Sequence, residues 1–392
     1  MTNPLTTFWR KIQNYGFSVD HIDWVLFTSV LLISLAGLVT MNSFQEAGGT
    51  RAQSYFFDRQ IIWLLICFTV FFIASQIDWR FLRRTSVITA LFTFFCGLLI
   101  LLFAAGTIAK GAKSWFDFGG FAFQPSDPAK LVLILLLAKY FTRRHIEIAY
   151  VRHILVSGAY AFILFVLILV QPDFGSAIII FALWFGMVLV SGISKKHVLA
   201  VAVLGTAAFL VLWLFVFQTY QKQRILTFIH PLTDIRGTGY NAYQSTIAVG
   251  SGRVLGKGVG YGTQSKLQFL PEYETDFIFA SYAEEWGFIG VILLFILYAV
   301  LLSRIIANAQ VAAGNFETFF GLGLAILFII HIIIHAGMNM GLLPVTGTTI
   351  PFMSYGGSHL LTEFLGLGIL MGMRKYNRAV HRDEALHEIH GI

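Results

Sequence analysis

The stretch S-V-I-T-A-L-F-T-F-F-C-G-L-L-I-L-L-F-A-A, residues 86–105, runs for twenty residues without a charged side chain. A helix of about 20 apolar residues matches the hydrocarbon thickness of a membrane. Nine further, predominantly apolar stretches lie at 22–42, 60–77, 125–142, 153–170, 174–191, 197–218, 283–303, 317–341 and 355–373. We therefore predict an all-α polytopic membrane protein with about ten transmembrane helices.

The composition of the 392 residues supports this fold class, because 57% are hydrophobic, only 12% are charged and the mean hydropathy is +0.75. A soluble domain carries about 25% charged residues, so an ordinary soluble protein is excluded. A transmembrane barrel is disfavoured because its strands alternate polar and apolar residues. Both cysteines, Cys67 and Cys96, lie inside apolar stretches, which argues against a disulfide framework or a cysteine-based metal site. We treat 1–392 as a single transmembrane domain.

Lysine and arginine are unevenly distributed among the predicted loops. With the N-terminus in the cytoplasm, sixteen of the 27 cations lie in cytoplasmic segments and four lie in short outer loops. Short cytoplasmic loops of membrane proteins carry an excess of these residues. We therefore predict that the segment 1–21 and the tail 374–392 are both cytoplasmic. The net charge of +7 is then explained by topology, and nucleic-acid binding is not expected.

One predicted outer loop, residues 219–276 between the seventh and eighth spans, is much longer than the others. Loops beyond about 12–15 residues are usually functional or disordered. This loop is rich in Gly, Gln and Tyr but also contains apolar residues such as Val249 and Leu255. We expect a large, structured extracellular loop.

Polar residues interrupt the apolar sequence at four places, all predicted to lie toward the outer side. The first is F-Q-P-S-D-P-A-K, residues 123–130, at the start of the fourth span. Ser126 is placed to cap that helix, with Pro128 in its first turn. Asp127 and Lys130 are three residues apart, so their side chains can pair on one helix face. A purely structural ion pair and a functional one are equally compatible with this spacing.

The second place is the turn Q-P-D-F-G, residues 171–175, between two apolar spans. Asp173 is predicted to cap the following helix, although a role in a site level with Asp127 stays open.

The third place is L-P-E-Y-E-T-D-F-I-F-A-S-Y-A-E-E, residues 270–285, where Asp276 opens an apolar helix. Asp276 is a candidate helix cap, and it is also the best-placed general base or cation ligand. Glu284 lies about 12 Å further along that helix, which is too far for the two carboxylates to work as an acid–base pair.

The fourth place is G-L-L-P-V-T-G-T-T-I-P-F-M-S-Y-G-G-S, residues 341–358, which combines Pro, Gly and hydroxyl residues inside apolar sequence. Irregular backbone at membrane depth is tolerated where it is buried in protein or lines a cavity, so we predict a re-entrant loop. His331 and His335 are spaced to bind a metal on one helix face. With no carboxylate adjacent in sequence, packing and hydrogen bonding between helices are favoured over a metal site.

These motifs together resemble the SEDS proteins, the RodA and FtsW family of cell-wall polymerases, over nearly the whole chain. The resemblance rests on F-Q-P-S-D (123–127), Q-P-D-F-G (171–175), G-T-Q-S-K-L-Q-F-L-P-E (262–272), T-D-F-I-F-A (275–280) and G-G-S (356–358). The stretch G-T-G-Y-N-A-Y-Q-S-T-I-A-V-G-S-G-R, 237–253, looks closer to the elongation branch, RodA, than to the division branch, FtsW.

The chain departs from the usual pattern of this family at three positions. Asp127 stands where the family usually has Glu, followed by Pro128 in place of a hydrophobic residue. Ser114 precedes Trp115 where the family usually has Arg, while Lys113 supplies a cation one residue earlier. Glu274 replaces the usual His before T-D-F, and its negative charge beside the aspartate favours cation binding or raises a neighbouring pKa.

The resemblance implies a peptidoglycan glycosyltransferase for cell elongation and shape, which joins lipid II units at the outer face of the bacterial cytoplasmic membrane. It implies Asp276 as general base or as ligand of a divalent cation, Mg2+ or Mn2+, and a class B penicillin-binding protein as partner. Cationic side chains would bind the diphosphate, and the remaining polar residues would shape the cavity. The expected substrate-binding residues are Lys113, Trp115, Gln124, Ser126, Asp127, Lys130, Asp173, Arg224, Arg253 and Ser358.

Three other functions stay open at this stage. A lipid II flippase would also need many spans and ionisable groups at membrane depth. An FtsW-like division polymerase would share the chemistry and differ in its cellular role. A scaffold that only recruits the penicillin-binding protein would not explain why costly polar groups gather at one depth.

Overall fold

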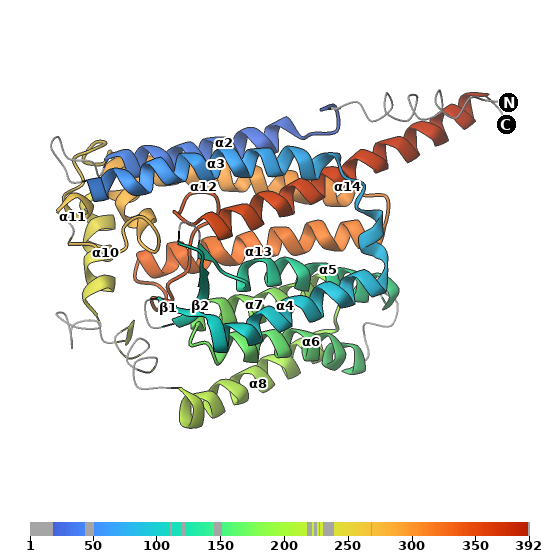
Figure 1. The fold of residues 1–392 in the computed structure, drawn as a ribbon, viewed down its shortest axis with the longest axis horizontal. Helices are drawn as coiled ribbons and strands as arrows, with labels where there is room; N and C mark the ends of the chain where they lie inside the picture. Colours follow the sequence, from blue (N-terminus) through green and yellow to red (C-terminus); the bar gives the residue numbers. More distant parts are fainter. Residues whose placement is uncertain are drawn as a thin grey trace.

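The computed structural model is a bundle of long helices that lie roughly side by side (Figure 1). It describes residues 19–43, 51–109, 112–119, 122–144, 151–217, 222, 226, 228–229, 239–267 and 269–390. The helices in chain order are α2 (Trp24–Ser43), α3 (Arg51–Gln76), η1 (Trp79–Arg83), α4 (Thr85–Ala105), α5 (Ser126–Arg144), α6 (Val151–Leu169), α7 (Phe174–Val190), α8 (Lys195–Val211), η2 (Leu212–Val216), α10 (Tyr240–Ser251), α11 (Thr263–Lys266), α12 (Ile278–Gln310), α13 (Asn315–Asn339) and α14 (Gly357–His390).

Every predicted apolar stretch overlaps one of the helices α2 to α8 or α12 to α14. Within the described residues, six helices are long and apolar enough to cross a membrane, and α7 and much of α8 form shorter apolar helices. The chain is therefore a multi-pass helical membrane protein, as predicted. The number of ten spans stays a prediction, because α5 and α14 carry charged residues and α7 is short for a span.

A small β-sheet is an exception to the all-α prediction. Strands β1 (Thr107–Ala109), β2 (Ala112–Asp117) and β3 (Ala122–Phe123) form an antiparallel sheet in the order β1-β2-β3. It lies between α4 and α5, in a segment where only a short loop was expected. The pairing places Thr107 opposite Trp115, and the Thr107 hydroxyl donates to the Trp115 carbonyl over 3.0 Å.

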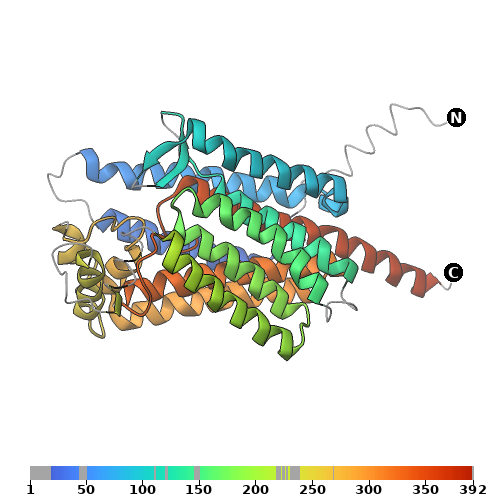
Figure 2. The same cartoon turned by 90° about the horizontal axis from the view of Figure 1, so that it is seen from below.

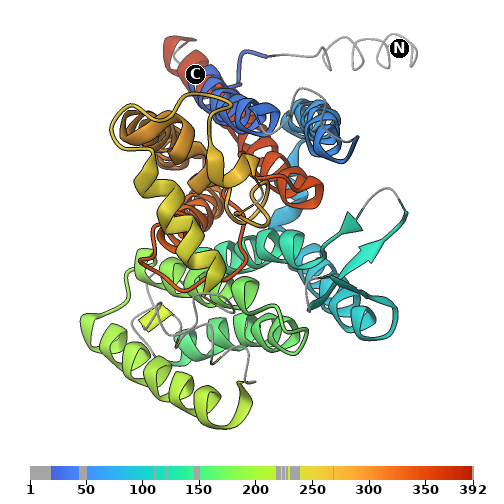
Figure 3. The same ribbon diagram turned by 90° about the vertical axis from the view of Figure 1, so that its left-hand side faces the viewer.

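The segments predicted as outer loops gather at one end of the bundle. In Figure 1, β1, β2, α10 and α11 all lie at the left-hand end, and the view from that end in Figure 3 shows α10 lying across the ends of the long helices. The C-terminal part of α14 projects from the opposite end (Figure 2). Ala248 of α10 and Leu270, both in the described part of the long loop, pack with Phe277 and Ala280 at the start of α12 in a small second core.

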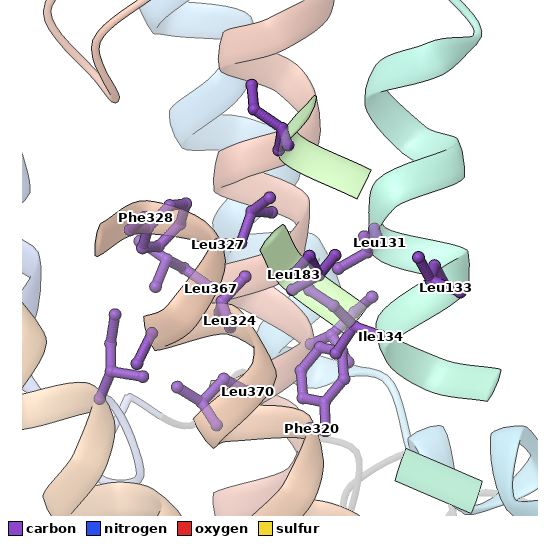
Figure 4. Packing of buried hydrophobic residues seen from close by; sticks show 14 of the residues in the cluster. Leu131, Leu133, Ile134, Leu183, Phe320, Leu324, Leu327, Phe328, Leu367 and Leu370 are labelled. Carbon is purple, nitrogen blue, oxygen red and sulfur yellow. The ribbon is translucent and has the colours of Figure 1, made fainter. Parts of the chain in front are cut away.

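The main core extends through most of the bundle, and one part of it lies where α5, α7, α13 and α14 meet. Figure 4 shows Leu131, Leu183, Phe320, Phe328 and Leu367 from these four helices packed together. Lipid tails are as apolar as leucine, so close packing rather than hydrophobicity selects the helix partners. This part of the core fixes α5, α7 and α14, at whose ends several predicted site residues lie, whereas Asp276 precedes α12.

Buried ion pairs connect helices at the end away from α10. Asp23 accepts hydrogen bonds from Arg304 and Asn308 of α12, both over 2.9 Å, and it caps α2 through the Leu26 N–H. Glu317 of α13 accepts from Arg83 over 2.7 Å. Burial opposes ionisation of Asp23, but the hydrogen bonds from Arg304 and Asn308 outweigh it and hold its pKa below the usual range.

Helix α12 is kinked at Gly287, where φ is 63°. The kink leaves the Phe288 and Ile289 N–H groups outside the helical pattern, and they donate to the carbonyls of Arg253 and Val254 over 2.9 and 3.1 Å. A Cβ at Gly287 would overlap the backbone nitrogen of Gly256, so only glycine allows the two segments to approach this closely. The turn after α10 is therefore docked directly onto α12.

Candidate functional site

The Q-P-D-F-G turn forms one wall of the candidate site. Asp173 caps α7, as predicted, because its Oδ1 accepts from the Ser176 N–H over 3.0 Å. Its Oδ2 accepts from the Gln124 side chain over 3.0 Å. The Gln124 N–H donates in turn to the Ser358 hydroxyl over 3.2 Å. Three predicted site residues, from segments far apart in the sequence, are thus in direct contact at the outer-loop end of the bundle.

Asp127 and Lys130 form the predicted ion pair at the start of α5. The Lys130 ammonium donates to Asp127 Oδ1 over 3.0 Å, and both side chains are almost completely buried. The prediction that Ser126 caps α5 is wrong, since its buried hydroxyl has no hydrogen-bond partner. Pro128 has no N–H to offer, and the Ala129 N–H donates to the Pro125 carbonyl instead. No backbone donor therefore remains for the serine.

Asp276 lies just before α12 and is half-buried. The first residue of α12 is Ile278, so Phe277 and not Asp276 occupies the N-cap position. The prediction that Asp276 caps this helix is therefore wrong. Its carbonyl accepts from the Asn339 side chain over 3.0 Å. A Cβ at Gly347 would lie 3.5 Å from Asp276 Oδ2, so the 341–358 segment passes directly beside the carboxylate.

The 341–358 segment is a buried loop, as predicted for a re-entrant segment. It runs without helix or strand to Gly356, and Ile350, Phe352 and Met353 are almost inaccessible. Its Thr346 carbonyl lies 2.7 Å from where a Cβ of Gly175 would be, so it packs tightly on the Q-P-D-F-G turn. The loop therefore brings the Asp173 wall and Asp276 to the same place.

Residues that the sequence did not single out hold this arrangement together. Asn339 is fully buried; besides Asp276, its side chain donates to the His335 carbonyl and accepts from the Ala280 N–H and the Ser245 hydroxyl. His359 and Glu363 of α14 lie beside the Asp127–Lys130 pair. The contacts that join them to Asp127, Phe352 and Asp276 come from distant parts of the sequence or from other elements, and the i,i+4 spacing of His359 and Glu363 is the local signal that could have indicated this pair.

Glu284 serves the long loop and not the acid–base chemistry. It is fully buried and accepts from the Lys257 ammonium over 2.6 Å and from the Thr263 and Gln264 N–H groups over 3.0 and 3.1 Å. The expectation that it does not pair with Asp276 therefore agrees with its contacts.

For four of the predicted substrate-binding residues, the described part of the structure gives no contact with Asp276. Trp115 is half-buried in the β1–β2 hairpin. Arg253 is exposed on the turn docked at Gly287, with φ of 47°. Lys113 lies in β2, but its side chain falls outside the described part of the structure, and Arg224 lies entirely outside the described residues.

Both histidines form hydrogen bonds, although not the expected ones between helices, since one contacts its own helix and the other contacts the buried loop. His331 Nδ1 contacts the Leu327 carbonyl at 2.8 Å, and His335 Nδ1 contacts the Thr348 carbonyl at 2.7 Å. In the part of the chain that the structure describes, no group of three or more His, Cys, Asp or Glu side chains is arranged to hold a metal ion. A metal bound only by protein side chains does not fit these residues. A cation shared between one carboxylate and substrate phosphates is a different arrangement, and Mg2+ commonly adopts it.

The pKa of Tyr273 is affected by the carboxylates near the T-D-F motif. Burial, followed by the nearby carboxylates of Glu274 and Glu272, raises the pKa of its phenol. The phenol therefore stays protonated at neutral pH and can donate a hydrogen bond. The effect of Glu274 on Asp276 or on a bound cation stays a prediction.

Comparison with known proteins gives consistent matches over almost the whole chain. A model of the FtsW/RodA/SpoVE family, described as cell cycle protein, matches residues 21–379. The peptidoglycan glycosyltransferase MrdB of Escherichia coli K12 is 33% identical over 379 residues, covering 96% of this chain and 97% of MrdB. Stage V sporulation protein E of Bacillus subtilis is 33% identical, covering 91% of this chain and 98% of that protein.

Solved structures match with similar coverage. A chain from the work "Structural coordination of polymerization and crosslinking by a peptidoglycan synthase complex" superposes with a TM-score of 0.75 at 28% identity, covering 91% of this chain and 98% of that one. The crystal structure of the rod shape determining protein RodA of Thermus thermophilus superposes with a TM-score of 0.67 at 28% identity, covering 91% and 97%.

Proposed function

The chain belongs to the FtsW/RodA/SpoVE family of cell cycle proteins, and on this premise we propose that it joins lipid II units into glycan strands. It is a peptidoglycan glycosyltransferase, the activity named for its relative MrdB. The observation that carries the proposal is the convergence at Asp276. The Q-P-D-F-G turn, the buried 341–358 loop and the start of α12 meet beside this half-buried carboxylate.

The reaction needs a base and a stabilised leaving group. Asp276 accepts the proton of an acceptor sugar hydroxyl, whose oxygen forms the new glycosidic bond to the donor anomeric carbon. The bond from that carbon to the lipid diphosphate breaks, and the diphosphate leaves with the electron pair. Asn339 fixes the backbone of Asp276 through its carbonyl, which keeps the carboxylate in position for this step.

Cationic side chains stabilise the charge that develops on the departing diphosphate. Lys113, Arg224 and Arg253 are the candidates from the sequence. Lys130 is buried against Asp127, so its first role is to neutralise that carboxylate and shape the cavity. As the alternative role for this carboxylate, Asp276 would be the protein ligand of a divalent cation, Mg2+ or Mn2+, which would add positive charge at the diphosphate.

We also propose an elongation role at the outer face of the bacterial cytoplasmic membrane, with a class B penicillin-binding protein as partner. The stretch 237–253 supports the elongation role. The peptidoglycan synthase complex that contains a similar chain supports the partner. Arg83, Arg304, Arg374 and Lys375 lie at the end of the bundle away from α10, which supports a cytoplasmic location for that end.

The test is polymerisation of purified lipid II by the detergent-purified protein. We expect glycan chains from the wild type and none from Asp276→Asn or Asp276→Ala. The control variant is Asp58→Asn, which changes an exposed carboxylate in the N-terminal part of α3 and should give normal chains. Lipid II translocation in vesicles without glycan product would identify a flippase instead. Loss of activity with a chelator, restored by Mg2+ or Mn2+, would support the cation, and full activity of Asp276→Ala would refute the assignment of the base.

A further inference from the structure

The buried loop contains a strained turn directly behind Asp276. Phe352 has φ of 61°, a backbone conformation that a bulky residue adopts only when the surroundings enforce it. Its ring is buried against Phe328 and Phe364, and its N–H donates to Glu363 Oε2 over 2.9 Å. Glu363 therefore satisfies the buried N–H of this turn and helps to hold the unfavourable conformation.

The same turn holds the chain segment that carries Asp276. The Ser354 hydroxyl donates to the Thr275 carbonyl over 2.9 Å, and the Tyr355 N–H donates to the Glu274 carbonyl over 2.9 Å. Both acceptors immediately precede Asp276. A change in the turn at Phe352 would therefore move the backbone of the proposed base.

On its other side, Glu363 is connected to the Asp127–Lys130 pair through His359. His359 Nε2 lies 2.9 Å from Glu363 Oε1, one helical turn away on α14, and Nδ1 lies 3.3 Å from Asp127 Oδ1. Each ring nitrogen of His359 therefore lies within ion-pair distance of a carboxylate, and Nδ1 is the one aligned for a hydrogen bond.

The space between these side chains is small. The cavity that they line, together with His331, has a volume of about 10 Å³, which is space for about one water molecule. His359 and Glu363 are therefore connected to Asp276 through the residues that they hold.

We propose that His359 and Glu363 are positioning residues of the proposed glycosyltransferase. The His359 ring lies between the buried Asp127–Lys130 pair and Glu363, and Glu363 fixes the turn at Phe352, which in turn holds the backbone that carries Asp276. The inference rests on the proposed function for its kinetic consequence. Its structural consequence, a rigid 350–356 segment, does not depend on the reaction.

The experiment compares Glu363→Ala with Glu363→Gln in the full-length, detergent-purified protein. The amide oxygen of Gln can still accept the Phe352 N–H, whereas Ala offers no acceptor. Glu317→Ala is the matched control, because it also removes a buried, paired carboxylate. Glu317 lies in the first turn of α13, at the end of the bundle away from α10. Two quantities are measured on the folded fraction: hydrogen exchange of the 350–356 amides, and kcat and KM for lipid II.

We expect Glu363→Ala to raise exchange in 350–356 at least about tenfold and to lower kcat about tenfold, with KM within about threefold. Glu363→Gln should restore both, and Glu317→Ala should change neither. Wild-type exchange and kcat in Glu363→Ala would overturn the proposal, as would Glu363→Gln behaving like Glu363→Ala. If Glu363→Ala does not fold, His359→Ala replaces it with the same expectations.

The two readouts separate this proposal from the function on which it rests. If the wild-type protein makes no glycan from lipid II, the proposed function fails, and hydrogen exchange alone decides whether Glu363 holds the turn. If the wild type polymerises lipid II and exchange in Glu363→Ala is unchanged, the function stands and the positioning role is refuted.

Discussion

Replacing Lys130 with Met should destabilise the protein strongly, because it leaves the carboxylate of Asp127 buried without its ammonium partner. The two groups lie 3.0 Å apart, and their side chains are each only 4% exposed. At that distance and an effective dielectric constant of about 20, their attraction is about 5 kcal/mol before desolvation is subtracted. Removing one partner of a buried pair typically costs about 3–5 kcal/mol.

The remaining neighbour of Asp127 sets where in this range the cost should fall. His359 still contacts Asp127 Oδ1 at 3.3 Å, so we expect Lys130→Met to cost about 3 kcal/mol. The double variant Asp127→Asn/Lys130→Met buries no unpaired charge, and it should recover about 2 kcal/mol of that loss. Unfolding in detergent, followed by tryptophan fluorescence for the wild type, both single variants and the double variant, gives the coupling energy.

The same four proteins distinguish the structural role of the pair from a role in substrate binding. A purely structural pair predicts that the double variant recovers both stability and lipid II polymerisation. If Lys130 also binds the diphosphate, stability returns without activity. The reasoning from burial is refuted if Lys130→Met costs less than about 1 kcal/mol, or if the double variant is no more stable than the single one.

Three further predictions follow from contacts outside this pair. Gly287→Ala should lower the free energy of unfolding by at least about 3 kcal/mol, because φ at this position is positive and an added Cβ would overlap the Gly256 backbone. Thermal unfolding measures this loss, and Gly97→Ala is the control, because no atom lies within 4 Å of its added carbon. Asn339→Ala should cost about 2 kcal/mol and lower kcat, because buried backbone groups lose their partners, which unfolding and polymerisation assays will measure. The lowered pKa of Asp23 means that its ionisation stabilises the folded state above pH about 4, and that this stability is lost as the pH falls through the lowered value. Unfolding between pH 7 and pH 3 should therefore be less pH-dependent in Asp23→Asn, and an identical pH dependence would contradict this account.

Local signals in the sequence predicted the features that depend on near neighbours. Apolar runs of span length predicted the helices, the three-residue spacing predicted the Asp127–Lys130 pair, and a turn before an apolar helix predicted the Asp173 cap. Ser126 was mispredicted for an equally local reason. The two donors that it would cap are removed by Pro128 and by the bond from Ala129 to the preceding turn.

Long-range contacts could not be predicted in the same way. Gln124 meets Ser358, and Asp127 meets His359, across more than two hundred residues. In a membrane bundle nearly every helix face is apolar, so hydropathy shows that a helix is buried in lipid or protein but not which helix it packs against. The kink at Gly287 could not be predicted for a related reason. The carbonyls that accept from the Phe288 and Ile289 N–H groups lie in the preceding loop.

The buried loop explains how a segment without helix or strand can form a rigid wall of the site. Polar side chains from three helices satisfy its backbone: Gln60 of α3 donates to the Ser354 carbonyl, Tyr298 of α12 donates to the Pro351 carbonyl, and Glu363 of α14 accepts from the Phe352 N–H. An unsatisfied backbone group at this depth would be costly, so each bond fixes the loop against its helix. Anchors on three separate helices restrain the loop in more than one direction, and they are present before any substrate binds. The wall beside Asp276 is therefore preorganised by contacts within the protein.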